Sequence, residues 1–220
     1  MEYSAVIFDL DGTLLDTLAD IADAANRVLL SRQLPTHEVA TYRHFVGNGV
    51  EALMQRALPP EHQDAETIAS SSVQFRRVYG ETWNLTTLPF PGIHELLGLL
   101  GQRQLQMAVL SNKPHPNTIE CIKQFFDDST FALVHGQRDD VPSKPHPAPA
   151  LAISSAFDVP PSQCLFVGDS DVDMQTAVSA GMRGIGVTWG FRARGELLES
   201  GASHVIDHPL DLLDIVVERG

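Results

Sequence analysis

The sequence has few basic residues and few cysteines. Of its 220 residues, 15 are Lys or Arg and 28 are Asp or Glu, so the formal net charge is −13. A chain this acidic is not built to hold nucleic acid or an anionic membrane by bulk electrostatics, so we expect neither as a partner. The two cysteines, Cys121 and Cys164, indicate no disulfide framework, and no Cys/His cluster has the spacing of a zinc site.

Long apolar segments are missing as well. No apolar run approaches the roughly 20 residues that a membrane helix requires. The first residues also lack the basic-then-apolar pattern of a secretory signal. We therefore expect a cytoplasmic protein, acting as a monomer or a homodimer. A hydrophobic content of 43% with 20% charged residues is typical of a globular domain.

The apolar residues instead form short runs with little alternation, which is typical of parallel strands buried on both faces. These runs cover residues 5–10, 107–110, 131–134, 164–167, 185–188 and, more weakly, 204–206. Helical patterns separate them, at 93–102, 116–126, 147–157, 171–180 and 210–218. This alternation predicts an α/β fold with a doubly wound, mostly parallel, Rossmann-like sheet.

One long segment interrupts the alternation. From residue 18 to residue 83 the sequence shows helical patterns and no convincing strand. Roughly 65 residues is far longer than a usual connection between a strand and a helix, so we expect an inserted helical subdomain. The segment Pro89-Phe90-Pro91-Gly92 marks the return to the main domain. We predict a core of residues 1–16 and 84–220 and an inserted helical domain of residues 17–83.

Two carboxylates follow the first predicted strand. Asp9 and Asp11 are two residues apart, and Gly12 and Thr13 then turn the chain. Open α/β sheets bind ligands at the carboxyl ends of their strands. Asp9 and Asp11 could therefore share the work of nucleophile and acid/base around a metal ion. The alternative is an ordinary Asp-rich turn.

Two later segments carry groups suited to phosphate. Ser111 and Asn112 follow the second predicted strand, and a hydroxyl with neighbouring backbone N–H groups can bind phosphate oxygens. Lys144 is one of few lysines, and Pro145 and Pro147 follow it in a rigid segment. A fixed ammonium would offset the repulsion between a carboxylate nucleophile and an incoming phosphate. Taken singly, these segments also fit a turn and a solvent-exposed lysine.

A second strand also ends in acidic residues. Gly168 and Asp169 follow the run 164–167, and Asp173 comes four residues later. Mg²⁺ prefers oxygen ligands, often one or two carboxylates with water and substrate phosphate. Neighbouring parallel strands would bring Asp169 and Asp9 to one edge of the sheet. The alternative is an acidic first turn of a helix, which the helix dipole favours.

These motifs resemble those of the haloacid dehalogenase (HAD) superfamily. The segment Asp9-Leu10-Asp11-Gly12-Thr13-Leu14 is similar to its first motif, and 168–173 fits its Gly-Asp-Ser-x-x-Asp pattern. The resemblance implies a Mg²⁺-dependent phosphatase with an aspartyl-phosphate intermediate and a helical cap. The second acid, Asp11, argues for phosphoryl chemistry, because dehalogenases of the superfamily lack it. The resemblance implies catalytic roles for Asp9, Asp11 and Lys144. It implies metal binding by Asp9, Asp169 and the Asp11 carbonyl, and by Asp173 either directly, through water or as a partner of the ligands. It implies substrate binding by Ser111 and Asn112, and by Thr13 through orienting Asp11 or supporting the turn.

A glycine-rich segment in the insertion bears on the substrate. Gly47, Asn48 and Gly49 precede a predicted helix, and their backbone N–H groups suit a small anion. Similar loops occur in phosphoglycolate phosphatases, which the layout resembles most, so the expected substrate is 2-phosphoglycolate. Arg43 and His44, just upstream, could meet a substrate carboxylate.

Other activities remain open on the same scaffold. The protein could instead be a HAD phosphatase or pyrophosphatase of other specificity, a β-phosphoglucomutase, or a non-catalytic phosphate-binding regulator. A dinucleotide-binding module is disfavoured, because no Gly-x-Gly-x-x-Gly turn follows the first predicted strand.

Overall fold

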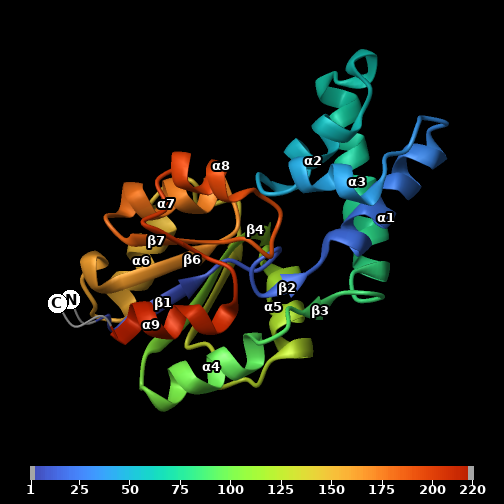
Figure 1. Ribbon diagram of the computed structural model, residues 1–220. Helices are drawn as coiled ribbons and strands as arrows, with labels where there is room; N and C mark the ends of the chain where they lie inside the picture. The colour runs from blue at the N-terminus through green and yellow to red at the C-terminus, as the bar shows by residue number, and fades with distance from the viewer. Residues whose placement is uncertain (1–2, 218–220) are drawn as a thin grey trace. The chain divides into compact units, whose positions relative to one another are not determined.

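A computed structural model describes residues 3–217 of the chain (Figure 1). The chain divides into two compact units. The core unit holds the described residues up to Leu15 and from Pro89 onward, and the helical unit is Asp16–Leu88. We expected Asp16 and residues 84–88 to belong with the core, but they group with the helical unit. For residues 84–88 the reason is that Thr86 and Thr87 donate hydrogen bonds to the Asp20 carboxylate.

The core unit is built on a parallel sheet of six strands in the order β5-β4-β1-β6-β7-β8. The central strand β1 pairs in parallel with β4 and β6, so that Ala5 aligns with both Gln106 and Cys164. The strands are β1 (Ala5–Phe8), β4 (Gln106–Pro114), β5 (Leu133–Gln137), β6 (Cys164–Gly168), β7 (Arg183–Val187) and β8 (His204–Ile206). The predicted parallel α/β fold is thus confirmed.

Helices cover both faces of this sheet, which explains why its strands are continuously apolar (Figure 1). On one face, Ile7 and Phe166 pack with Ile153 of α6 in a single buried cluster. On the other face, Phe8 meets Phe131 edge-on, with ring centres 6.4 Å apart. The helices are α4 (Ile93–Gln102), α5 (His115–Phe125), α6 (Ala148–Ala156), α7 (Asp171–Ala180), α8 (Arg194–Glu199) and α9 (Leu212–Val217), with 3-10 turns η3 (Pro161–Gln163) and η4 (Pro209–Asp211).

Several predicted elements of the core differ in extent from those observed, including β1, which ends at Phe8, and β7, which begins at Arg183. The second strand was expected to end at Leu110, but β4 continues to Pro114, and its register with β5 shifts between Leu110 and Pro114. The third strand was expected from Phe131, but that ring packs in the core and β5 begins at Leu133. The last helix begins as the 3-10 turn η4 before α9, and Glu218, where we expected it to end, lies outside the described residues.

The helical unit is formed by three helices and connecting 3-10 turns. Buried Ile21, Ala25 and Val28 lie on one side of α1, as expected of an amphipathic helix. The Asp64 carboxylate caps α3 by accepting the Thr67 backbone N–H. The elements are α1 (Leu18–Ser31), η1 (Val39–His44), α2 (Gly49–Ala57), η2 (Pro60–His62) and α3 (Ala65–Thr82). Two short strands, β2 (Leu15–Asp16) and β3 (Leu88–Pro89), pair where the chain passes between the units.

The helices of the described chain are too short or too polar to cross a bilayer. Over residues 3–217, none combines the length and the apolar character needed to span one.

Candidate active site

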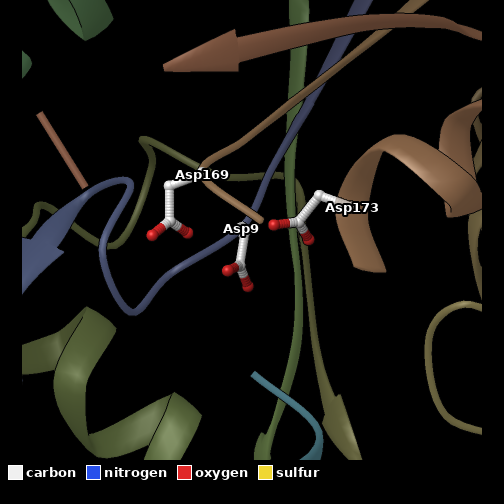
Figure 2. A group of neighbouring side chains, drawn as sticks. All are labelled: Asp9, Asp169 and Asp173. Atoms are coloured by element: carbon white, nitrogen blue, oxygen red, sulfur yellow. The ribbon is translucent and has the colours of Figure 1, made fainter. Parts of the chain in front are cut away.

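Three aspartates meet at the carboxyl edge of the sheet (Figure 2). Asp9 directly follows β1 and extends its pairing, since its N–H donates to the Val167 carbonyl of β6 at 2.9 Å. Asp169 follows β6, and Asp173 lies in the first turn of α7. All three are buried, and one carboxylate oxygen of each lies within 4.8 Å of the others. The parallel register of β1 and β6 therefore brings together the two acidic motifs found in the sequence.

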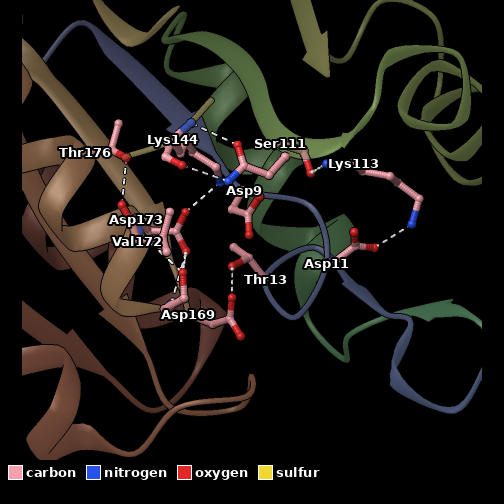
Figure 3. A network of polar contacts seen from close by, with 12 residues as sticks. Asp9, Asp11, Thr13, Ser111, Lys113, Lys144, Asp169, Val172, Asp173 and Thr176 are labelled. Atoms are coloured by element: carbon pink, nitrogen blue, oxygen red, sulfur yellow. Dashed lines mark hydrogen bonds and ion pairs between the residues drawn. The ribbon is translucent and has the colours of Figure 1, made fainter. Parts of the chain in front are cut away.

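Lys144 lies against this cluster (Figure 3). Its Nζ is 2.7 Å from Oδ1 of Asp9 and 2.6 Å from Oδ1 of Asp173. Its backbone is fixed by the side chain of Asn112, which accepts the Lys144 N–H at 2.9 Å and donates to the Lys144 carbonyl at 3.0 Å. The ammonium also lies 5.6 Å from the centre of the Phe166 ring. Lys144 is thus a rigidly held cation beside Asp9.

The electrostatics of the cluster are dominated by burial and by repulsion between carboxylates. Burial, reinforced by the charge of Asp173, raises the pKa of Asp9 from 3.8 to about 7, although Lys144 opposes the shift. Burial and the charges of Asp173 and Asp9 raise the pKa of Asp169 well above its usual range. Burial disfavours the charged form of Lys144, but the charges of Asp173 and Asp9 outweigh it and raise its pKa. Of these three carboxylates, Lys144 contacts only Asp9 and Asp173, and the charge of Arg192 offsets the shift of Asp169 only in part, so repulsion between the carboxylates persists.

This donor set fits a divalent cation with a preference for oxygen. Buried carboxylates that repel one another are stabilised when a cation is added between them, and Mg²⁺ accepts such ligands together with water and phosphate oxygens. Both oxygens of Asp173 already have partners: Oδ1 contacts Lys144, and Oδ2 accepts hydrogen bonds from the Ser170 N–H and hydroxyl. Asp169 likewise has a partner on each oxygen, the Thr13 hydroxyl on Oδ1 and the Phe191 N–H on Oδ2, so which of the three carboxylates bind a metal directly remains a prediction.

Thr13 makes a contact that supports the turn, one of its two expected roles, and a further contact that was not expected. The Thr13 N–H supports the turn by donating to the Leu10 carbonyl, but its hydroxyl donates to Oδ1 of Asp169 at 3.4 Å rather than to Asp11. The Asp11 carboxylate forms an ion pair with Lys113, with Nζ 2.8 Å from Oδ1. Thr13 thus connects the turn after β1 to Asp169.

Ser111 is buried next to β1, within β4 rather than at its end. Its Oγ accepts the backbone N–H of Lys113 at 3.2 Å. The structure thus places Ser111, Lys113 and Lys144 in the same unit as the three aspartates. The binding of phosphate by Ser111 and by the backbone of Asn112 remains a prediction.

Lys113 was missed by our reading of the sequence. The signal was available: the chain has only three lysines, and both Lys113 and Lys144 precede a proline. Lys113 is buried, as is Lys144, and each contacts a carboxylate of the first motif.

The loop after β7 was missed as well. The Phe191 N–H donates to Oδ2 of Asp169 at 2.7 Å, and Nε1 of Trp189 donates to the Thr13 carbonyl at 3.0 Å. Between them, a Cβ on Gly190 would lie 2.3 Å from Cβ of Asp169 and 2.4 Å from the Gly12 carbonyl oxygen. This loop therefore holds Asp169 against the turn after β1. Its position after a strand at the same sheet edge was the available signal.

The residues of the predicted anion-binding loop lie in the helical unit. Gly47, Asn48 and Gly49 lead into α2. The Asn48 side chain does not cap that helix, because its Oδ1 accepts a hydrogen bond from Arg56 at 2.7 Å. Arg43 and His44 are exposed at the end of η1. Substrate binding by this loop and these side chains remains a prediction.

The parallel sheet and its acidic edge define a hydrolase of the haloacid dehalogenase type. A family model of haloacid dehalogenase-like hydrolases matches residues 6–187. The chain belongs to this family, and it is a phosphatase.

Individual relatives agree with this assignment. The chain is 35% identical to a phosphoglycolate phosphatase of Pseudomonas putida over 206 residues, covering 92% of this chain and 75% of that protein. It is 33% identical to a phosphoglycolate phosphatase of Escherichia coli, covering 91% and 87%. A structure from Haemophilus somnus, described as a predicted phosphoglycolate phosphatase, superposes with a TM-score of 0.90 at 30% identity, covering 98% of each chain. A hydrolase structure from Pseudomonas syringae has a TM-score of 0.80 at 28% identity, again covering 98% of each.

Proposed function

We propose that this phosphatase is a Mg²⁺-dependent phosphomonoester hydrolase that acts on 2-phosphoglycolate. The observation that carries the proposal is the group formed by Asp9, Asp169 and Lys144 at the carboxyl edge of a parallel sheet. Carboxylate oxygens of Asp9 and Asp169 lie within 4.8 Å of each other, and the Lys144 ammonium contacts Asp9. The choice of substrate is supported by the relatives named phosphoglycolate phosphatase, which match over nine-tenths of the chain.

Mg²⁺ would be held by the carboxylates of Asp9 and Asp169 and by the Asp11 carbonyl, and it would neutralise charge on the transferring phosphoryl oxygens. The Asp9 carboxylate attacks phosphorus, the bond from phosphorus to the ester oxygen breaks, and an aspartyl-phosphate forms. The leaving oxygen takes its proton from Asp11. Asp11 then removes a proton from the water that hydrolyses the aspartyl-phosphate and regenerates Asp9.

Other residues would stabilise charge during these steps. Lys144 lies beside Asp9, so its ammonium would face the phosphoryl group and offset the repulsion of two anions. The Ser111 hydroxyl and nearby backbone N–H groups would bind the remaining phosphoryl oxygens. Asp173 would act through Lys144 and Ser170, which already occupy both of its oxygens. The helical unit would serve as the cap, with residues 47–49 near the substrate.

The test is phosphate release from 2-phosphoglycolate, pyrophosphate and hexose phosphates, with and without Mg²⁺, using Asp9→Asn as the inactive control. We expect 2-phosphoglycolate to be hydrolysed fastest, only with the metal, and not by Asp9→Asn. A preference for another ester under the same controls would overturn the substrate assignment. A folded protein that hydrolyses none of these compounds would contradict the catalytic proposal and favour a phosphate-binding regulator. A cytoplasmic location and a monomeric or dimeric state are part of the same proposal.

A further inference from the structure

A second group of cationic and titratable side chains lies in the core unit, apart from the three aspartates. His115 is the first residue of α5 and directly follows β4, and Arg138 directly follows β5. His135 lies on β5 itself. In the sheet order, β4 separates β5 from β1, so this group lies beside an edge strand of the sheet. These three side chains have no part in the mechanism above.

The imidazole ring of His115 faces two hydrogen-bond donors. The backbone N–H of Gly136 donates to Nδ1 of His115 at 3.2 Å. A guanidinium nitrogen of Arg138 lies 3.3 Å from Nε2 on the other side of the ring. A neutral imidazole has one nitrogen that accepts and one that carries a proton, and a charged imidazolium has no acceptor at all. The ring therefore cannot accept hydrogen bonds from both donors in any protonation state.

The backbone determines which ring nitrogen carries the proton. Gly136 is packed tightly against His115, because a Cβ on Gly136 would lie 2.6 Å from Cα of His115 and 2.8 Å from the Lys113 carbonyl oxygen. The direction of the Gly136 N–H is thus fixed, whereas the long side chain of Arg138 can rotate. Nδ1 is therefore the acceptor, and the proton is on Nε2. The Nε2–H of His115 and the guanidinium of Arg138 are then two adjacent donors.

The charges around this pair favour an anion. Arg138 is exposed and has no ion pair with a carboxylate among residues 3–217, although Asp139 and Asp140 follow it in the chain. Its charge also reaches both histidines. Burial and the charge of Arg138 lower the pKa of His115, and the same two causes, with a smaller contribution from His115, lower the pKa of His135. An anion placed here would reduce this repulsion.

We propose that His115 and Arg138 form a binding site for a small oxyanion, separate from the aspartate cluster. The oxyanion accepts one hydrogen bond from the Nε2–H of His115 and others from the guanidinium of Arg138. Phosphate and carboxylate oxygens both have this capacity, and the planar guanidinium suits either group. Two sources of such an anion are inorganic phosphate, which a phosphatase releases, and the carboxylate of an organic acid. The inference does not depend on the substrate proposed above.

The test follows the ring resonances of His115 by NMR at pH 7.5 without Mg²⁺, while inorganic phosphate or glycolate is added. His115→Gln assigns these resonances. We expect a saturable shift with at least one of the two anions, and no such shift with chloride at the same ionic strength. Arg138→Gln should weaken the binding of that anion by about 10-fold, because charge-assisted hydrogen bonds are lost. The anion that binds more tightly identifies the ligand as a phosphate or a carboxylate.

The matched control is Arg103→Gln, which removes the same charge from an exposed arginine at the end of α4. Its affinity for the anion should match that of the wild type. Equal weakening by the two substitutions would indicate an effect of net charge and would overturn the proposal. A His115 ring that responds to neither anion, or equally to chloride, would overturn it as well.

A further variant separates this site from the active site. Ser111→Ala removes the hydroxyl that is predicted to bind phosphate, and we expect it to leave the saturable shift of His115 unchanged. Loss of the shift in Ser111→Ala would place the anion in the active site and overturn the proposal. These measurements involve no turnover, so their outcome is distinguishable from a failure of the proposed function, which concerns the hydrolysis of 2-phosphoglycolate.

Discussion

The ammonium of Lys144 lies 2.7 Å from the carboxylate of Asp9, and this contact joins two segments that are 135 residues apart in sequence. This contact places a fixed positive charge beside the carboxylate that we propose as the nucleophile. A second carboxylate, that of Asp173, holds the ammonium from the other side at 2.6 Å. The pair is therefore part of a buried network in which each charge depends on the others.

Replacement of Lys144 tests this network. Lys144→Met should lower kcat by about 1,000-fold, because the transferring phosphoryl group loses a preorganised cation. The reduction is measured by phosphate release at saturating 2-phosphoglycolate and Mg²⁺. Lys144→Arg keeps the charge but not the compact shape of the ammonium, so it should retain the fold and only part of the rate. A Lys144→Met enzyme with more than a tenth of the wild-type kcat would contradict the role given to Lys144.

The raised pKa of Asp9 predicts how pH and metal affect stability. The folded, metal-free protein holds a proton on Asp9 up to about pH 7, whereas the unfolded chain releases it near 3.8. Folding therefore takes up protons in this window, and the contribution of Asp9 to stability falls as pH rises through it. Mg²⁺ binds the deprotonated form, so its stabilising effect should grow with pH. We expect the Mg²⁺-induced rise in Tm to be larger at pH 7.5 than at pH 5 by about 3 °C or more.

The control for this measurement is Asp9→Asn, which removes one of the mutually repelling charges. At pH 7.5 without metal it should melt above the wild type, and Mg²⁺ should raise its Tm much less. A Mg²⁺ effect on Tm that is the same at both pH values would show that protons and metal do not compete at the aspartate cluster.

Because the loop after β7 holds Asp169, we expect a substitution in this loop to weaken metal binding even though the loop supplies no metal ligand of its own. In Gly190→Ala the new Cβ would lie 2.3 Å from Cβ of Asp169, so Asp169 or the turn at Gly12 has to shift. We expect Mg²⁺ to bind about 10-fold more weakly or worse, measured by calorimetry and by the fluorescence of Trp189 in the same loop. The matched control is Gly195→Ala in α8, where a Cβ meets nothing within 4 Å. Equal metal affinity in the two variants would contradict the positioning role of the loop.

Much of this architecture could be predicted from the sequence, because parallel strands are buried on both faces and leave short apolar runs. The runs at 5–10 and 164–167 correctly located β1 and β6, and with them the edge where Asp9 and Asp169 meet. The end of β4 was harder to locate, because polar Ser111, Asn112 and Lys113 extend an apolar strand and look like a turn.

What the sequence could not reveal were contacts between residues that carry no recognisable motif. Trp189 and Gly190 carry no catalytic group. The indole N–H of Trp189 donates to the Thr13 carbonyl, and the backbone at Gly190 lies close to Asp169. Thr13 was expected to orient Asp11 or to support the turn; its N–H supports the turn, and its hydroxyl reaches Asp169, which follows another strand. Such partners are set by strand order and register, which no local pattern contains.

Asp20 provides the last prediction, in the helical unit. Although it is buried, it accepts hydrogen bonds from the backbone N–H and the hydroxyl of both Thr86 and Thr87. Burial alone would raise the pKa of Asp20, but these hydrogen bonds outweigh it and lower the pKa below 3.8. A lowered pKa in the folded state means that the ionised carboxylate stabilises the protein above about pH 4, and that this contribution is lost as pH falls further.

Asp20→Asn should therefore lower the free energy of unfolding by about 2 kcal/mol at pH 7, because an amide is a weaker acceptor and brings N–H groups that face other donors. Urea denaturation measures the difference, which should shrink as the pH is lowered below 4. Asp23→Asn is the matched control on the same helix: Asp23 forms an exposed ion pair with Arg27 at 2.8 Å, and its loss should change stability by less than about 0.5 kcal/mol. Equal effects of the two substitutions would show that the hydrogen bonds of Asp20 do not hold the segment around Thr86 and Thr87 to α1. The grouping of that segment with the helical unit would then need another cause.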